Sequence, residues 1–543
     1  MANAEHSYAG RQVDMSRCFA VLVLAMGTVG AGAPQQAATA HDPSHQQELG
    51  AVTFLNSCSA AVQVEFQRGV AMLHSYWFGY AGKTFRSVLD QDPGCAMAYW
   101  GMALDLLGNT LSYPPSRQNA DAAWKLLEEA RSVPPKTDRE RAWLDAVRAY
   151  LRNHDSVPVA KRLSDYNAEM KQIAAKYPSD TEAQVFYALT LQASASKTDL
   201  TYTNQLEAAA ILERVFSENP KHPGATHFII HAYDYAPLAQ KGIPAARRYA
   251  SIAPAVPHAR HMPAHIYSMV GLWEDSIVSN LSALEIQPDY YHAADFTVYA
   301  YLQLAQDGKA QALIQKATNT PVRGDRPVVM SNFTALAAMP ARYVLERADW
   351  KGAARLPVIA SAYPQADSIT RFTRGLGMAR SGDLAGARRE IAAMEQLRKA
   401  LQGPDSAYWA DRTSEQILAV SAWLALAEGA KDRAVADMGR AAEGEDASVK
   451  DIAMENRLYP MRELLGDLLL EVGQPSAAVR AYATALTNTP NRYRGIYGAA
   501  RAAQADGDRA AAADYFTKLI ALAKNADTQR PELAAARAFL AER

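Results

Sequence analysis

Three prolines near the middle of the chain, Pro220, Pro254 and Pro288, stand 34 residues apart. The two intervals between them have the helical periodicity, with short Pro and Gly punctuation, that runs along most of the sequence. A fixed period of this length indicates repeated helix pairs, and a single pair cannot bury its apolar face alone. We therefore expect an all-α chain of stacked antiparallel helix pairs, in place of the three or four domains that 543 residues would otherwise suggest.

Small and large residues recur at matching positions in other parts of the chain. Small Gly and Ala residues let two helices approach closely, large residues fill the gap between them, and proline follows the pair. The clearest sets are Gly69, Ala81, Phe85, Val88 and Pro93, and Gly466, Ala478, Tyr482, Ala485 and Pro490. Further sets are Gly375, Gly382, Ala387 and Ile391, then Gly429, Ala434, Met438 and Ala441, then Ala512 and Phe516.

These spacings resemble the tetratricopeptide repeat family over most of residues 55–530. The resemblance implies a right-handed superhelix, an α-solenoid, whose concave groove binds a peptide, protein or small-molecule ligand. The stretches "HPGATHFIIHAYD" and "HARHMPAHIY" are also similar to those of uncharacterised exported bacterial proteins of this family. We expect a signal peptide at 1–40, N-terminal repeats at 41–188, histidine-rich central repeats at 189–320 and C-terminal repeats at 321–543.

The beginning of the sequence has the order of a secretory signal peptide. Arg11 and Arg17 precede the apolar run "CFAVLVLAMGTVG", and a stretch of small residues follows, with cleavage expected after Ala33 or Ala40. The run is too short for a membrane anchor, and no other stretch approaches 18 uninterrupted apolar residues. We expect a periplasmic or secreted protein without a membrane span after cleavage. The alternative is a buried apolar segment of a cytosolic protein.

Two of the three cysteines, Cys58 and Cys95, lie outside this segment. In an oxidising compartment they could form one disulfide, and otherwise they are two separate buried thiols. Neither cysteine is an obvious catalytic nucleophile.

Histidine is concentrated in the central repeats. Six of the chain's twelve histidines lie within residues 222–267, and His292 follows. Repeat register predicts that Thr226, Ile229, Ile230 and Tyr233 face the core. By resemblance to the family, the neighbouring stripe of each first helix lines the concave groove. That stripe carries His227, His231 and Asp234, then His258, His261 and His265, then His292 and Asp295.

This stripe predicts a transition-metal site. Residues four apart on a helix lie on one face, as His227 and His231 or His261 and His265 do, so each pair can share one ion. Neutral imidazole suits Zn, Cu or Fe. The predicted ligands are His227, His231, His258, His261, His265 and His292. An anion- or peptide-binding cluster and a hydrogen-bonded structural network are the alternatives, and His222 is expected to cap or line a loop.

A proline complicates the second part of the stripe. Pro263 is comfortable at a first helical position but would remove a hydrogen bond inside a helix. We therefore expect the helix to begin near Pro263, with His258 and His261 on an irregular turn before it.

Three functions remain open. The first is an exported solenoid that binds a ligand or partner in a groove with a transition-metal site. The second is a metal-dependent enzyme, hydrolase- or oxygenase-type, in which Asp234 or Asp295 acts as base and a tyrosine such as Tyr267 donates a hydrogen bond. The third is a metal-free interaction scaffold. The near balance of 56 basic and 57 acidic residues argues against nucleic acid as a partner.

Overall fold

The computed structural model describes residues 48–109, 111, 114–321, 329–450 and 457–542. Within these ranges the chain is built of helices joined by short connections, and they contain no β-strand. The chain is an all-α solenoid of antiparallel helix pairs, as expected. The predicted signal peptide lies outside the described residues.

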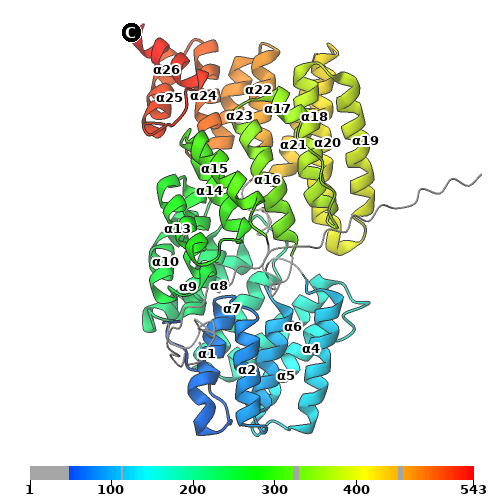
Figure 1. The fold of residues 1–543 in the computed structure, drawn as a ribbon, viewed down its shortest axis with the longest axis vertical. Coiled ribbons are helices and arrows are strands. Elements are labelled where there is room, and N and C mark those ends of the chain that lie inside the picture. The colour runs from blue at the N-terminus through cyan, green and yellow to red at the C-terminus, as the bar shows by residue number, and fades with distance from the viewer. Residues whose placement is uncertain (1–47, 110, 112–113, 322–328, 451–456, 543) are drawn as a thin grey trace, which may run out of the picture. The chain divides into compact units, whose positions relative to one another are not determined.

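Figure 1 shows the helices in chain order, from blue to red. The first group consists of α1 (Gln63–His74), α2 (Tyr80–Gln91), α3 (Ala96–Leu107), α4 (Arg117–Glu129), α5 (Asp138–Leu151), α6 (Val159–Lys176), α7 (Thr181–Ala193) and α8 (Thr203–Glu218). The central group consists of α9 (Pro223–Tyr233), α10 (Ala239–Ile252), α11 (Pro257–His261), α12 (Pro263–Val270), α13 (Trp273–Ile286), α14 (Tyr291–Gln303) and α15 (Asp307–Thr318).

The last group consists of α16 (Met330–Glu346), α17 (Trp350–Ala354), α18 (Pro364–Ser381), α19 (Leu384–Ala400), α20 (Ala407–Ala427), α21 (Lys431–Asp446), α22 (Met461–Glu471), α23 (Pro475–Asn488), α24 (Tyr493–Ala505), α25 (Arg509–Leu522) and α26 (Pro531–Ala541). Several helices begin at a proline, whose fixed φ suits a first helical position. None of the helices in the described ranges is long and apolar enough to cross a membrane. The subdivision at residues 188 and 320 stays a prediction.

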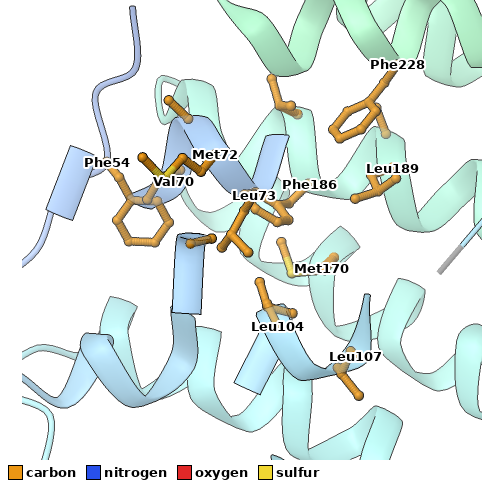
Figure 2. Packing of buried hydrophobic residues seen from close by; sticks show 14 of the residues in the cluster. Phe54, Val70, Met72, Leu73, Leu104, Leu107, Met170, Phe186, Leu189 and Phe228 are labelled. Carbon is orange, nitrogen blue, oxygen red and sulfur yellow. The ribbon is translucent and has the colours of Figure 1, made fainter. Parts of the chain in front are cut away.

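Glycines allow the close helix packing that the sequence pattern predicts. The Phe85 ring on α2 lies where a Cβ on Gly69 or Gly101 would stand, only 2.8 and 2.5 Å from ring carbons. Tyr482 on α23 fills the same kind of space against Gly466 and Gly498. Figure 2 shows the result in the first repeats, where buried apolar side chains of α1, α3, α6, α7 and α9 meet in one core.

Cys58 and Cys95 form a disulfide, which settles the choice left open by the sequence. It ties the segment before α1 to the connection between α2 and α3. The link joins residues 37 positions apart.

The C-terminal helices contact the central ones across long sequence separations. The Trp273 indole donates to the Asn491 carbonyl oxygen at 2.8 Å. The Arg530 guanidinium, also buried, donates to the Leu302 carbonyl oxygen at 2.9 Å and pairs with Asp307. The solenoid is therefore tied to itself between repeats that are not neighbours in sequence.

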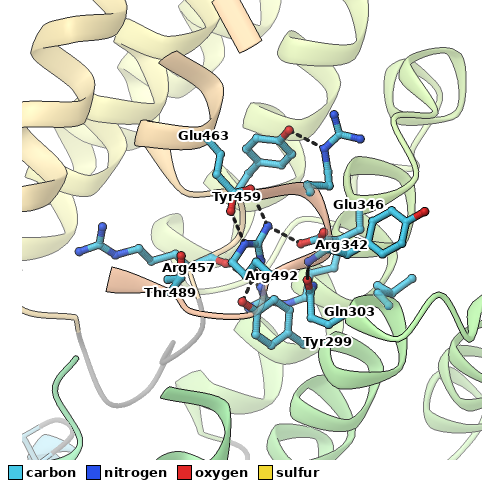
Figure 3. Close-up of polar contacts among 12 residues, drawn as sticks. Tyr299, Gln303, Arg342, Glu346, Arg457, Tyr459, Glu463, Thr489 and Arg492 are labelled. Atoms are coloured by element: carbon cyan, nitrogen blue, oxygen red, sulfur yellow. Dashed lines mark hydrogen bonds and ion pairs between the residues drawn. The ribbon is translucent and has the colours of Figure 1, made fainter. Parts of the chain in front are cut away.

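A buried ionic network lies at this contact, as Figure 3 shows. Arg492, which precedes α24, donates to Glu463 at 2.7 Å and to the Tyr299 hydroxyl at 2.7 Å, and pairs with Glu346 at 2.7 Å. The Arg492, Glu463 and Glu346 side chains are no more than 1% exposed. Because a guanidinium offers five donors, it can hold two carboxylates and a phenol from three helices together.

Candidate metal centre

Helix α9 is buried on every side. Its N-cap is His222, whose Nδ1 accepts from the Ala225 N–H at 3.1 Å, which confirms the expectation that His222 caps a turn. The predicted core residues Thr226, Ile229, Ile230 and Tyr233 are buried, but so are His227, at 0% exposure, and His231, at 4%. The stripe on α9 is therefore buried, whereas His258 and His292 of the later helices are half-buried. The expectation that the stripe lines the concave groove stays a prediction.

The proline at 263 divides the next helix, as expected. Helix α12 begins at Pro263, and Met262 lies between α11 and α12. His258 and His261 lie in α11, a single helical turn rather than an irregular one. His261 and His265 face each other across Met262, which has right-handed helical dihedral angles.

Three histidines form what we call the first triad: His227, His231 and His258. One ligand atom from each lies within 4.8 Å of the others. The Nε2 atom of His227 is 3.0 Å from Nε2 of His231 and 3.0 Å from Nε2 of His258. Three ring nitrogens from two consecutive repeats thus converge on one point.

A second triad, His261, His265 and His292, meets the same criterion. Its histidines come from α11, α12 and α14. The Nε2 atoms of His261 and His265 are 2.9 Å apart. All six predicted metal ligands are therefore brought together, three in each triad.

Hydrogen bonds to Nδ1 determine which nitrogens of these rings carry lone pairs. His265 Nδ1 lies 3.0 Å from Asp234 Oδ2, and His261 Nδ1 lies 2.5 Å from Asn280 Oδ1, whose amide nitrogen donates to the Ser276 carbonyl oxygen. Carboxylate and carbonyl oxygens only accept, so both rings donate from Nδ1. A neutral ring then has a lone pair on Nε2, and two such lone pairs face each other across 2.9 Å.

The first triad is held in a similar way. His227 Nδ1–H donates to the His74 carbonyl oxygen at 2.6 Å, so its Nε2 also carries a lone pair. The Tyr290 hydroxyl bonds His258 Nδ1 at 2.9 Å. Such outer hydrogen bonds fix the tautomer and orientation of a metal-ligating histidine.

Burial keeps these imidazoles neutral. It lowers the pKa of His227, His231, His258, His261 and His292 well below 6.5, and neighbouring histidines lower it further. The neutral imidazole is the form that binds metal.

In each triad, one aromatic ring contacts all three histidines. The Tyr76 ring centroid is 4.6 Å from that of His227, 5.3 Å from that of His258 and 6.2 Å from that of His231. The Phe296 centroid is 5.0 to 5.1 Å from those of all three histidines in the second triad. Tyr76 has a φ of +52°, a conformation that is strained in a residue with a side chain and is common at functional sites.

Asp234 joins the second triad to a distant part of the chain. Its Oδ2 accepts from His265 and, at 2.8 Å, from the Lys450 ammonium, which follows α21. Burial alone would raise the pKa of Asp234, but Lys450 and His265 hold it below its ordinary value. Asp234 meets Nδ1 of His265, on the side of the ring away from Nε2, so it orients this ligand from outside the triad.

A cavity reaches the centre beside Asp234. It has a volume of about 60 Å³ and is lined by residues that include His231, Asp234, Tyr235 and Lys450. A larger cavity of about 300 Å³ shares Tyr235 and Lys450 with it and extends to Tyr202 and Tyr299. The Val449 N–H donates to the Lys197 carbonyl oxygen at 2.9 Å and positions Lys450 between the two cavities.

The other two predicted catalytic residues are engaged elsewhere. Both carboxylate oxygens of Asp295 accept from Arg342, at 2.9 and 3.2 Å. Burial raises the pKa of Tyr267, and its charged neighbours are Asp275 and Arg247. Tyr267 is two residues from His265 and hence on a different face of α12. Within the described residues, no hydrogen bond or ring contact joins it to a triad histidine.

A third buried cluster, which the sequence did not predict, lies beside the first triad. The Glu182 carboxylate bonds His74 Nε2 at 2.7 Å and His222 Nε2 at 3.0 Å. Burial alone would raise the pKa of Glu182, but the two histidines hold it below its ordinary value. Glu182 lies 40 residues from His222, and no local pattern in the sequence links them.

Comparison with known proteins gives similarity of fold alone. No protein-family model matches the chain, and no curated protein does. The chain is similar to a structure of the APC/C hetero-tetramer Cut9-Hcn1, at 12% identity over 90% of this chain and 78% of that chain, with a TM-score of 0.36. It is also similar to the human IFIT1 dimer with m7Gppp-AAAA, at 14% identity over 79% of this chain and 90% of that chain, with a TM-score of 0.39. A second structure, the human IFIT1 dimer with PPP-AAAA, is similar at 13% identity over 75% of this chain and 87% of that chain, with a TM-score of 0.37. Nothing about the histidine centre follows from these.

Proposed function

We propose that the protein is a metal-dependent enzyme that binds a transition metal, Zn, Cu or Fe, through its two histidine triads and acts on a small molecule. The observation that carries the proposal is the 2.9 Å separation between Nε2 of His261 and Nε2 of His265. Both rings donate from Nδ1, so their lone pairs would repel each other unless a cation lies between them. A metal ion accepts both lone pairs and converts the repulsion into two bonds.

The surroundings of the triads favour catalysis over storage. Three imidazoles leave a coordination position for water or substrate, whereas a closed structural site takes four protein ligands. The buried triads are shielded from bulk solvent, which strengthens electrostatic interactions with a bound substrate. The cavity beside His231 and Asp234 gives a small molecule a route to the centre. A ligand or protein partner elsewhere on the solenoid, without catalysis, is the alternative.

We also propose that the protein is exported to the periplasm or secreted. The disulfide between Cys58 and Cys95 supports this, because disulfides persist in oxidising compartments. N-terminal sequencing of the protein from a periplasmic fraction would test it. Recovery only from the cytoplasm, with residues 1–40 still attached, would overturn it.

Elemental analysis of the protein, purified without a polyhistidine tag, tests the metal site. We expect about one metal ion per triad in the wild type and loss of about half of the bound metal in the His261→Ala, His265→Ala variant, which leaves the first triad intact. The control is His154→Ala, because His154 bonds only Asp121 and the Leu151 carbonyl oxygen, far from both triads in sequence. Failure of the wild type to bind Zn, Cu or Fe after reconstitution would refute the proposal.

Ligand access separates an enzyme from a closed metal store. The Co(II)-substituted protein should change its visible absorption spectrum when azide is added, because azide would occupy the open position. An unchanged spectrum at saturating azide would show a closed coordination shell and exclude the enzymatic function.

A further inference from the structure

Building on the proposed function, we infer that the two triads form one dinuclear centre whose metal ions share a small anionic bridging ligand. The alternative is two independent mononuclear sites. Three features of the structure support the dinuclear arrangement: the distance between the triads, the aromatic rings beside them, and the charge of the ligands.

The triads lie almost as close to each other as their own members do. Ring centroids within a triad are 4.7 to 5.9 Å apart for the contacting pairs. Between the triads, the His231 and His265 centroids are 5.9 Å apart and the His258 and His261 centroids are 6.1 Å apart. Since a metal ion lies about 2 Å from each ligating nitrogen, two ions held here would be near neighbours.

The aromatic rings restrict the sides from which a further ligand could approach. In the described chain, Tyr76 has ring contacts with histidines of the first triad alone, and Phe296 with histidines of the second triad alone. Phe296 cannot ligate a metal. A ligand that completes the coordination of the second triad's ion is therefore directed to the region between the triads, which His231 and His265 border.

The charge of the ligand set calls for an anion in that region. Six imidazoles contribute no negative charge, and the nearby Asp234 carboxylate is paired with the Lys450 ammonium. Two divalent ions at close range in a buried site would repel each other strongly. A bridging anion reduces this repulsion and bonds both ions. The cavity at His231 has a volume of about 60 Å³, which is enough for hydroxide or a di- or triatomic molecule.

Copper loading and electron paramagnetic resonance test this inference. A ligand that bridges two Cu(II) ions couples their unpaired electrons, so the pair gives little signal. We expect the wild-type protein to bind two Cu(II) ions per chain while the integrated signal falls by about five-fold or more relative to the copper present. Elemental analysis of the same sample supplies the copper content.

The variant His292→Ala provides the matched comparison. His292 is the least buried member of the second triad: it is half-buried, whereas His261 is 0% exposed and His265 is 2% exposed. Its loss should therefore leave the fold intact, as circular dichroism would verify. We expect one Cu(II) per chain with its full signal. His154→Ala should behave as the wild type.

The outcomes distinguish the two proposals. Two copper ions per chain, both with full signal, or a single ion in the wild type, would overturn the dinuclear centre and leave a metal-binding function. No bound copper, zinc or iron in the wild type would overturn the proposed function itself.

Discussion

A single hydrogen on a buried imidazole determines what the ring can bind. His265 donates its Nδ1–H to Asp234, and this bond leaves Nε2 free to ligate a metal. A carboxylate in this position also raises the basicity of the ligating nitrogen. The outer hydrogen bonds of the triads are therefore as much a part of the centre as the six histidines.

Replacing Asp234 with Asn should weaken metal binding by about 10- to 100-fold, because a neutral amide holds the His265 Nδ1–H less strongly. Competition with a chelator of known affinity would measure the change. Asp121→Asn is the control, since Asp121 bonds the histidine at position 154, outside the triads. An affinity equal to that of the wild type would show that Asp234 does not support the centre.

Glu415, on α20, offers a second prediction at this scale. Burial raises its pKa from 4.5 to about 8; Glu445 adds to this effect and Arg412 opposes it. Between these pH values the folded protein retains a proton that the unfolded chain has lost, so stability falls as the pH rises towards 8.

The variant Glu415→Gln removes this dependence. At pH 8 we expect its free energy of unfolding to exceed that of the wild type by about 1 to 3 kcal/mol. Near pH 4.5 the two proteins should be equally stable. Denaturant titrations across this pH range would measure both. Parallel pH profiles for the two proteins would refute the assignment.

The six histidines of the triads were predicted because the repeat register, interpreted by resemblance to the family, places them on one stripe of three consecutive first helices. Helical periodicity argues against Tyr267, which is two residues from His265. Lys450, Asn280 and Tyr76 were missed because they reach the centre from segments whose approach no local pattern records. The partner of Asp295, Arg342, was missed for the same reason.

Among the helices, small residues determine how closely pairs pack. A Cβ on Gly498 of α24 would lie 2.2 Å from ring carbons of Tyr482, a side chain that is itself held by a 2.7 Å hydrogen bond to Asp467. The ring cannot move away without losing this bond. Glycine is therefore required at position 498 by its neighbour, not by its own backbone.

Gly498→Ala should lower the free energy of unfolding by about 1 to 3 kcal/mol through this clash. Gly439, within α21, has no atom within 4 Å of its would-be Cβ, so Gly439→Ala should stabilise the helix by about 0.5 to 1 kcal/mol. Thermal unfolding of both variants would measure the opposite shifts. Equal effects in one direction would contradict this account of the packing.

The repeat spacing was enough to predict these helix pairs, since the residues at Gly466, Ala478, Tyr482 and Ala485 are buried as the pattern requires. The break at Pro263 was also predictable from the chemistry of proline. That α11 is a helical turn, and not irregular chain, depended on packing against α13 and α10, which the local sequence does not specify.

Across the whole molecule, contacts join repeats that are far apart in sequence. One of them reaches the histidine centre, and another binds the C-terminal helices to the central ones. Lys450 reaches Asp234 across 216 residues, and Arg530 reaches Asp307 across 223. The family resemblance did not indicate these contacts, because periodicity describes neighbouring repeats and cannot predict contacts between distant ones.

Arg530→Ala should lower the free energy of unfolding by about 3 kcal/mol, because it leaves the buried Asp307 carboxylate without its closest cation. Arg117→Ala is the control: its ion pair with Asp121 is largely exposed, so the change should stay within about 0.5 kcal/mol. Denaturant unfolding would compare them. Similar small effects in both variants would show that the contact between α26 and the central repeats contributes little.

The contact between the Trp273 indole and Asn491 has a consequence for how such a chain could change over evolutionary time. In an open solenoid, duplication or deletion of one helix pair only lengthens or shortens the stack. Here the helices from α13 to α23 must span a fixed distance, because Trp273 at one end of that stretch is bound to Asn491 at the other. A single added or lost helix pair would separate Trp273 from Asn491. The number of repeats in this part of the protein is therefore constrained by a contact between its two ends.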